Sequence, residues 1–520
     1  MPTATASATL PPAPQALTDA IATVNAAHTG EESYAAVFTA LSTISLAIDA
    51  QSPSALPAYV AQHGIAPEPC LAILNQISPS DERMVGLVCA VLGKLLSIMS
   101  YVEISARYQL FTGARSIEVD VLAPSRRQPL LLAGFDHPSA LVRELVLTAL
   151  DKAPESEEGV VALAASPILQ AAIASLDHES MKVAVHVASI LVKLSRTPAG
   201  LAAALNPSST ATFHQLLMSD DETIKLRVHD AVAQIATLSD AAFDGVRRAG
   251  LLGSLVEDLE GTDLLAKINL VALFGKLVES PSGAQFLERS GTLGQLSNLM
   301  ASSSPADDID TVLTVCAAVK FFGRFAVTQM PIGSPQPPSY QPALLASLSG
   351  SYNVLPGICT LLESDRVELR EEALIAVGNL GSTPTGLRLL DSEAALLNGF
   401  VDAFRAAAGP LRVSGFRSLA CFLAASSVSL LLARSLCSDS PDDDVSSITE
   451  RVYRELGGRT AFLKELMQHA KSAFEENRIA AYAVIKGLAL HPWGVTEMAS
   501  SAEFISFLLD RAMDPSRIGK

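Results

Sequence analysis

The residue types that carry out catalysis or bind metals occur in this 520-residue chain, but their spacing suits neither task. None of the patterns HExxH, GxxxxGK[S/T], GxGxxG or GxSxG is present, and the nine histidines are spread along the chain. His178 precedes Glu179 but lacks the second histidine that a zinc-binding helix needs. The run Asp442-Asp443-Asp444 lacks the glycine and the closing glutamate of a calcium loop. The sequence therefore predicts no enzyme, no metal site and no cofactor.

A different set of polar residues recurs at a regular spacing. We use the term register position for a polar residue of this set that lies near the C-terminal end of a predicted helix. From Lys152 to Lys276, successive register positions are 41, 41 and 42 residues apart. Two longer intervals, of 48 and 55 residues, lead on to Arg324 and Asn379. Lys320 lies four residues before Arg324, on the same helical face. We predict that these residues form a partner-binding ladder, which comprises Lys94, Lys152, Lys193, Gln234, Lys276, Lys320, Arg324 and Asn379.

Two interpretations of the ladder stay open. In armadillo-like repeats the equivalent position, near the end of the third helix, faces a concave groove that holds a partner. On this interpretation Lys193, Lys276 and Arg324 face the groove as a cationic stripe suited to an acidic surface. Alternatively, lysine and arginine recur there because a cation near a helix C-terminus complements the helix dipole.

Repeats of helices must position this ladder. The segments "ILVKLSRTPAG" (190–200), "LFGKLVESPSG" (273–283) and "AVGNLGSTPTG" (376–386) each end an apolar-periodic helix with a Ser/Thr-Pro-x-Gly turn, and "ALHPWG" (489–494) repeats the turn. Polar turns such as "LDHESMKVAV" and "MSDDETIKLRV" come before the helices and are expected to cap them. A period of about 40–47 residues is typical of armadillo and HEAT repeats. We therefore predict an all-α, armadillo/HEAT-like α-solenoid that winds into a right-handed superhelix.

Loops and termini complete the predicted organisation. Residues 1–16 are of low complexity and are expected to be disordered, and residues 17–520 are expected to form a single solenoid. Loop insertions are predicted at 328–343, which is rich in proline, and at 437–447, which is acidic. The second loop is expected to lead into a helix through the capping box Ser447-x-x-Glu450.

One aromatic cluster, "AAVKFFGRFAV" (317–327), could be taken for a ligand box. On a helix, Val319 and Phe322 share one stripe, with Phe325 beside it, so we interpret the phenylalanines as core packing. Gly323 is expected to let a neighbouring helix approach closely. Arg324 then occupies a register position.

Composition excludes several classes of function. The formal charge is −17 with a pI near 5.0, which disfavours binding to nucleic acid or to an anionic membrane. The six cysteines form no CxxC pair, and the N-terminus does not resemble a secretory signal. The longest apolar stretch, 420–433, is too short and too serine-rich to span a bilayer. We expect a soluble protein in the cytoplasm, with the nucleus as a second compartment.

Several segments resemble one family. "RRAGLLGSLVEDLEGTDLLAKINLV" (247–271), "AAVKFFGRFAV" and "HPWGVTEMASSAEFISFLLDRAMD" (491–514) are similar to the proteasome non-ATPase regulatory subunit 5 family, assembly chaperones of the 26S proteasome base. The resemblance implies a non-catalytic solenoid that binds the C-terminal region of an AAA-type ATPase subunit and leaves before the mature particle forms. It implies the large non-ATPase scaffold subunit as a further partner, no cofactor, and a monomer when free. The alternative is a generic armadillo-repeat adaptor for another protein.

Overall fold

The computed structural model describes residues 14–27, 33–78, 80–107, 137–178, 180–261, 263–301, 308–326, 347–426 and 443–509. Within these ranges the regular structure consists of α-helices and short 3₁₀ turns, with no β-strand. The chain divides into two compact units, Met1–Ser254 and Leu255–Lys520, which we describe separately. No single described helix is long and apolar enough to cross a membrane. One bent pair of helices, Glu157–Ala164 with Ile168–Asp177, is long and apolar enough only when the two are taken together.

The first unit contains short helices that alternate with longer ones. Its helices are α1 (Pro14–Ala26), α2 (Tyr34–Asp49), α3 (Leu56–His63), α4 (Pro67–Gln76), α5 (Glu82–Ser97), α6 (Tyr101–Arg107), α8 (Ala140–Leu150), α9 (Glu157–Ala164), α10 (Ile168–Ala174), α11 (Met181–Leu194), α12 (Pro198–Ala204), α13 (Pro207–Leu217), α14 (Glu222–Ala236) and α15 (Asp240–Arg248). Helix α16 (Leu251–Glu257) contains the boundary between the two units.

The second unit continues the same alternation. Its helices are α17 (Leu264–Leu277), α18 (Pro281–Arg289), α19 (Thr292–Ala301), α20 (Ile309–Gly323), α22 (Val354–Leu362), α23 (Val367–Leu380), α24 (Pro384–Ser392), α25 (Ala394–Ala406), α26 (Pro410–Leu423), α28 (Asp443–Glu455), α29 (Phe462–Ala470), α30 (Glu475–Leu488), α31 (Pro492–Ala499) and α32 (Ala502–Leu509).

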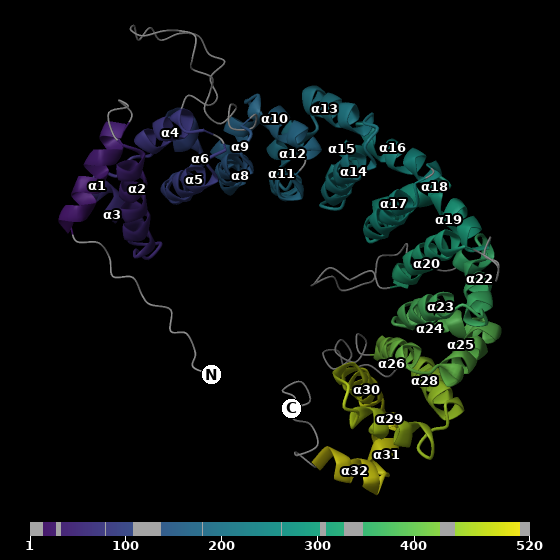
Figure 1. Cartoon of the computed structure of the whole chain (residues 1–520). Helices are drawn as coiled ribbons and strands as arrows, with labels where there is room; N and C mark the ends of the chain where they lie inside the picture. Colours follow the sequence, from purple (N-terminus) through teal and green to yellow (C-terminus); the bar gives the residue numbers. More distant parts are fainter. Residues whose placement is uncertain are drawn as a thin grey trace. The chain divides into compact units, whose positions relative to one another are not determined.

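Within each unit the longer helices stack side by side in chain order (Figure 1). We call them register helices, because the register positions lie at or just beyond the C-terminal ends of seven of them, α5, α8, α11, α14, α17, α20 and α23. The other three, α2 in the first unit and α26 and α30 in the second, stack in the same rows. A second row packs behind them, with α10 against α13 in the first unit, and α19 against α22 and α22 against α25 in the second. The predicted all-α, armadillo/HEAT-like solenoid is therefore confirmed.

The predicted Ser/Thr-Pro-x-Gly turn joins three register helices, α11, α17 and α23, to the short helices that follow them. After α11, the Thr197 hydroxyl accepts the Gly200 N–H at 3.1 Å, which caps α12. A Cβ on Gly200 would lie only 2.0 Å from the Leu194 carbonyl oxygen, so the turn needs glycine. The same hydroxyl-to-glycine distance and the same close approach recur at Ser280 with Gly283 and at Thr383 with Gly386.

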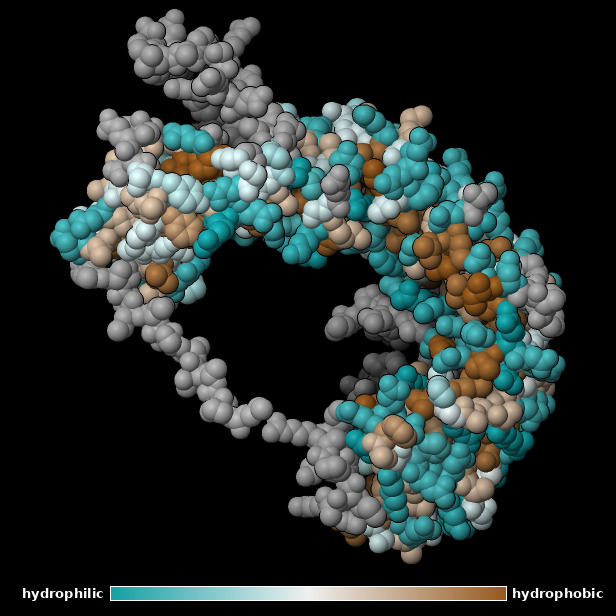
Figure 2. Space-filling view, in the orientation of Figure 1, coloured by the Kyte–Doolittle hydropathy of each residue, from teal (hydrophilic) through white to brown (hydrophobic). Residues whose placement is uncertain are grey.

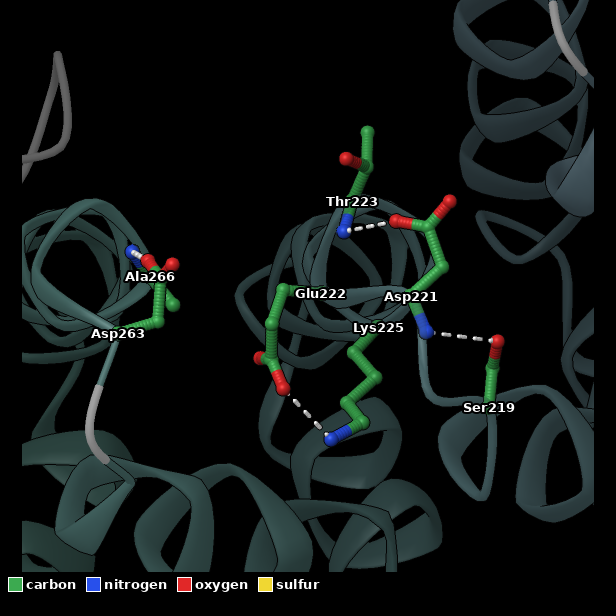
Figure 3. Close-up of polar contacts among 7 residues, drawn as sticks. All are labelled: Ser219, Asp221, Glu222, Thr223, Lys225, Asp263 and Ala266. Atoms are coloured by element: carbon green, nitrogen blue, oxygen red, sulfur yellow. Dashed lines mark hydrogen bonds and ion pairs between the residues drawn. The ribbon is translucent and has the colours of Figure 1, made fainter.

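Two of the polar turns before register helices cap them as predicted, whereas the turns before α8, α11 and α23 form no side-chain cap. Figure 3 shows the Asp221 carboxylate accepting the Thr223 N–H at 2.7 Å at the start of α14, and Asp263 accepting the Ala266 N–H at 2.7 Å at the start of α17. The bond from Thr223 lowers the pKa of Asp221. Ahead of α11 a histidine takes part in the turn instead, since Nδ1 of His178 accepts a backbone N–H at 2.8 Å.

The phenylalanines of residues 317–327 are packing residues, as predicted. Phe321, Phe322 and Phe325 are each at most 2% exposed, and the Phe321 ring meets the other two edge-on at 5.1 and 5.2 Å. A Cβ on Gly323 would lie 2.9 Å from the Ala376 Cα, so α23 approaches α20 closely at this glycine. The close approach predicted at Gly323 is thereby confirmed.

The predicted boundaries need two corrections. Helix α1 begins at Pro14, so residues 14–16 are helical instead of disordered. Helix α28 begins at Asp443, so the loop predicted at 437–447 ends earlier and Ser447 lies inside the helix instead of capping it. The reason is tertiary, because the Asp444 carboxylate pairs with Arg388 of α24 at 2.6 Å and accepts the Val445 N–H at 2.8 Å. The loop predicted at 328–343 lies outside the described residues.

Candidate partner-binding surface

In the first unit the ladder lysines contact the preceding repeat. Nζ of Lys193 lies 2.7 Å from both carboxylate oxygens of Asp151, which follows the last residue of α8. Lys152 donates to the carbonyl of Ser97, the last residue of α5, at 2.5 Å. Lys94 pairs with Asp49, the last residue of α2. Each lysine thus joins two successive register helices at their C-terminal ends.

These contacts bear on the dipole interpretation of the ladder. The lysines do complement helix C-termini, as the dipole interpretation requires, but the helix that benefits is the preceding one. Lys193 keeps 42% of its side chain exposed, so it is accessible as well as paired. Gln234 differs from the lysines, because its amide donates to Asp230 of the same helix at 2.8 Å.

In the second unit Lys276, Lys320 and Arg324 are exposed, and Asn379 is half-buried. The Arg324 side chain reaches back across α17, since a Cβ on Gly275 would lie 3.0 Å from its Nη1 and 3.4 Å from its Cδ. Arg324 therefore repeats the backward reach of the lysines and rests on a glycine instead of a carboxylate. Burial raises the pKa of Glu372 on α23, and the positive charge of Lys320 partly opposes this rise. That Lys193, Lys276 and Arg324 face a concave groove stays a prediction.

Apolar side chains accompany these cations on the same helices. Leu265 on α17 is 69% exposed and lies 11 residues before Lys276, while Leu313 on α20 is 40% exposed and lies 11 residues before Arg324. Eleven residues make about three helical turns, so each pair shares a face. Val367, at the start of α23, is 49% exposed. We call the exposed side of α17, α20 and α23 the second-unit face. At one end of it apolar side chains lie near the exposed acidic residues Asp310 and Glu368, and the other end is polar and mostly cationic.

Exposed apolar side chains are unevenly distributed over the surface. On the view drawn in Figure 2, apolar side chains form separate patches between hydrophilic ones. Sequence reasoning did not find the apolar part of the second-unit face, because a leucine on an apolar-periodic helix is expected to be buried. Only the packing of three successive helices leaves these side chains uncovered.

The described residues show no arrangement suited to metal binding or thiol chemistry. No group of three or more His, Cys, Asp or Glu side chains in the described ranges could hold a metal ion. Burial raises the pKa values of Cys70, Cys89 and Cys316 to about 12, so these thiols stay protonated near neutral pH. Cys437 lies outside the described residues.

His491 is a buried histidine whose protonation is expected to couple to folding. Its Nε2 donates to the Leu423 carbonyl at 2.8 Å, and the residue is 1% exposed. Burial, the larger effect, lowers its pKa below the usual 6.5, although the bond to Leu423 opposes this. Between the folded-state and unfolded-state pKa values, His491 is therefore protonated in the unfolded chain and neutral in the folded chain. Stability is fully present above about pH 6.5 and falls as the pH drops towards the folded-state pKa.

We expect the urea midpoint of the wild-type protein to fall between pH 7.5 and pH 5.5, and to fall less in His491→Gln. Glutamine can donate to the Leu423 carbonyl but does not titrate. The measurement is urea unfolding followed by circular dichroism at both pH values. An equal fall in the two proteins would show that His491 does not cause the pH dependence.

These observations define the class of protein. The chain is a helical-repeat protein whose register helices present an exposed surface of cations and apolar side chains. It belongs to the family described as "Proteasome non-ATPase 26S subunit", whose family model matches residues 115–520.

Two relatives and two solved structures also align with this chain. The chain is 23% identical over 457 residues to the human 26S proteasome non-ATPase regulatory subunit 5, covering 87% of this chain and 81% of that protein. The mouse protein of the same name is 23% identical over 454 residues, with the same two coverages. Among solved structures, an engineered protein aligns with 91% of this chain and 98% of its own at 13% identity and a TM-score of 0.38. A designed armadillo repeat protein aligns with 53% of this chain and 98% of its own at 18% identity and a TM-score of 0.33.

Proposed function

We propose that this protein is a non-catalytic assembly chaperone for the base of the 26S proteasome regulatory particle. In this role it binds the C-terminal region of an AAA-type ATPase subunit, together with the large non-ATPase scaffold subunit, and leaves before the mature particle forms. Membership of the proteasome non-ATPase family supports a partner within the proteasome. We place this activity in the cytoplasm, with the nucleus as a second compartment.

The observation that carries the proposal is the composition of the second-unit face. Stable protein interfaces combine an apolar centre with a polar rim, and arginine is enriched in them. Leu265, Leu313 and Val367 supply exposed apolar area, while Lys276 and Arg324 supply charge on the same helices. Such a face fits a partner with apolar side chains beside acidic ones. Binding of this kind is steric and reversible, so it needs no cofactor.

Co-purification tests the proposed role. The tagged protein should recover AAA-type ATPase subunits of the base without subunits of the core particle. Recovery of complete 26S particles, or of another cargo without any ATPase subunit, would contradict the role; the second result would favour a generic armadillo-repeat adaptor.

A triple charge reversal tests the surface. We expect Lys276→Glu with Lys320→Glu and Arg324→Glu to weaken binding to the ATPase subunit at least tenfold, because three exposed cations of the second-unit face become acidic. The affinity is measured by calorimetry with the purified ATPase C-terminal region. The matched control is Arg247→Glu with Arg289→Glu and Lys464→Glu, which changes the net charge equally at exposed positions on α15, α18 and α29. An equal loss of affinity in the two variants would show that net charge alone causes the effect. It would contradict the proposal that the second-unit face binds the ATPase subunit.

A further inference from the structure

A pocket of about 710 Å³ lies within the first unit, between the short helices α12 and α15. Its volume is in the range of pockets that hold small ligands or a few side chains. The pocket is distinct from the ladder, because no ladder residue lines it. The sequence does not predict this pocket, because its lining comes from two repeats and from the turns that connect their helices.

The charged side chains that line the pocket are all basic. Arg196 and Arg248 both line it, and none of the lining residues is acidic. Nε of Arg248 donates to the backbone carbonyl of Asp244 at 3.2 Å, which leaves its other N–H groups for a ligand. Within the described ranges neither guanidinium forms an ion pair with a carboxylate. In a chain of net charge −17, two such arginines at one pocket favour an anionic ligand.

The rest of the pocket is mainly apolar, and Leu205 bounds it on one side. Leu201, Leu205 and Pro198 line it, and a Cβ on Gly245 would lie 2.8 Å from the Leu205 Cδ1. Leu205 thus packs directly against α15 and closes the space between the two helices. Ser195 also lines the pocket; it is 4% exposed, and its hydroxyl has no hydrogen-bond partner among the described residues.

We propose that this pocket is a second binding site, which takes a peptide segment in which a carboxylate lies beside an apolar side chain. The planar guanidinium groups of Arg196 and Arg248 match the geometry of a carboxylate. The leucine and proline side chains would cover the apolar part of the ligand. The site does not depend on the proposed chaperone role, because the pocket residues lie outside the second-unit face.

Ligand-observed NMR titration of the full-length protein with short peptides tests this site. Acetyl-Leu-Phe, which has a free carboxylate, should bind at least tenfold more tightly than acetyl-Leu-Phe-amide, which has none. A third probe, acetyl-Leu-Phe-Glu-Leu-amide, carries its carboxylate on a side chain; whichever acidic probe binds more tightly identifies a chain terminus or a side chain as the source. Equal binding of acetyl-Leu-Phe and its amide would overturn the proposal.

Variants locate the binding on the protein. Arg196→Glu with Arg248→Glu should weaken acetyl-Leu-Phe binding at least tenfold. Ala202→Trp, at an exposed lining position, should block the pocket without a change in charge. Arg247→Glu is the matched control, because Arg247 neighbours Arg248 on α15 but does not line the pocket. Unchanged binding in the two pocket variants, or an equal loss in Arg247→Glu, would reject the site.

Discussion

Replacing Gly283 with alanine should lower the free energy of unfolding by about 1–3 kcal/mol, as overpacking of a tight site does. The new Cβ would lie 2.0 Å from the Leu277 carbonyl oxygen and 2.7 Å from its carbonyl carbon. Both are backbone atoms at the end of a buried register helix, so they cannot move aside as the tip of a side chain can. The change would also disturb the bond from the Gly283 N–H to the Ser280 hydroxyl.

Gly294 provides the matched control in the next helix. No atom lies within 4 Å of the position that its Cβ would occupy, so alanine fits there without strain. We expect Gly294→Ala to raise the free energy of unfolding by about 0.4–1 kcal/mol, because alanine restricts the unfolded chain. Urea unfolding of both variants measures the contrast. A loss in both, or in neither, would show that the Ser/Thr-Pro-x-Gly turn does not require its glycine.

Replacing Arg412 with alanine should cost about 2–3 kcal/mol, from the loss of stacking and of a largely buried ion pair. The guanidinium carbon lies 4.1 Å from the centre of the Phe404 ring and 5.3 Å from that of Phe416. Nε of Arg412 donates to Glu465 Oε1 at 2.7 Å, and its side chain is only 11% exposed. It also donates to the Phe404 carbonyl. The substitution would leave Glu465, 32% exposed, without this partner.

Two further variants separate charge from geometry at Arg412. Arg412→Lys should lose less stability than Arg412→Ala, since lysine keeps the charge but cannot reproduce the planar stacking. Arg247→Ala removes an ion pair with Asp244 in which both side chains are more than half exposed, and we expect a change within about 0.5 kcal/mol. Thermal and urea unfolding measure all three variants. A change in Arg412→Ala as small as that in Arg247→Ala would contradict the role of this cluster.

Local chemistry made much of the fold predictable. The turn before α12 depends on Thr197, Pro198 and Gly200, which lie next to one another in the sequence, so the motif could be recognised without knowledge of the fold. The caps at Asp221 and Asp263 are local in the same way. The prediction of a helix start at Ser447 failed because Arg388, 56 residues before Asp444, helps to determine where α28 begins.

The ladder shows where sequence and tertiary structure divide. The repeat by itself determined that a polar residue recurs near the ends of successive register helices from α5 to α23, because a recurring helical unit places equivalent residues at equivalent positions. Only the stacking of repeats decided that Lys193 is held by Asp151 and that Arg324 rests on Gly275. The pocket at Arg196 and Arg248 was likewise decided by tertiary structure, since its lining comes from two repeats. Contacts within one helical turn are determined by residues that are neighbours in the sequence, whereas contacts between repeats depend on how closely two helices approach.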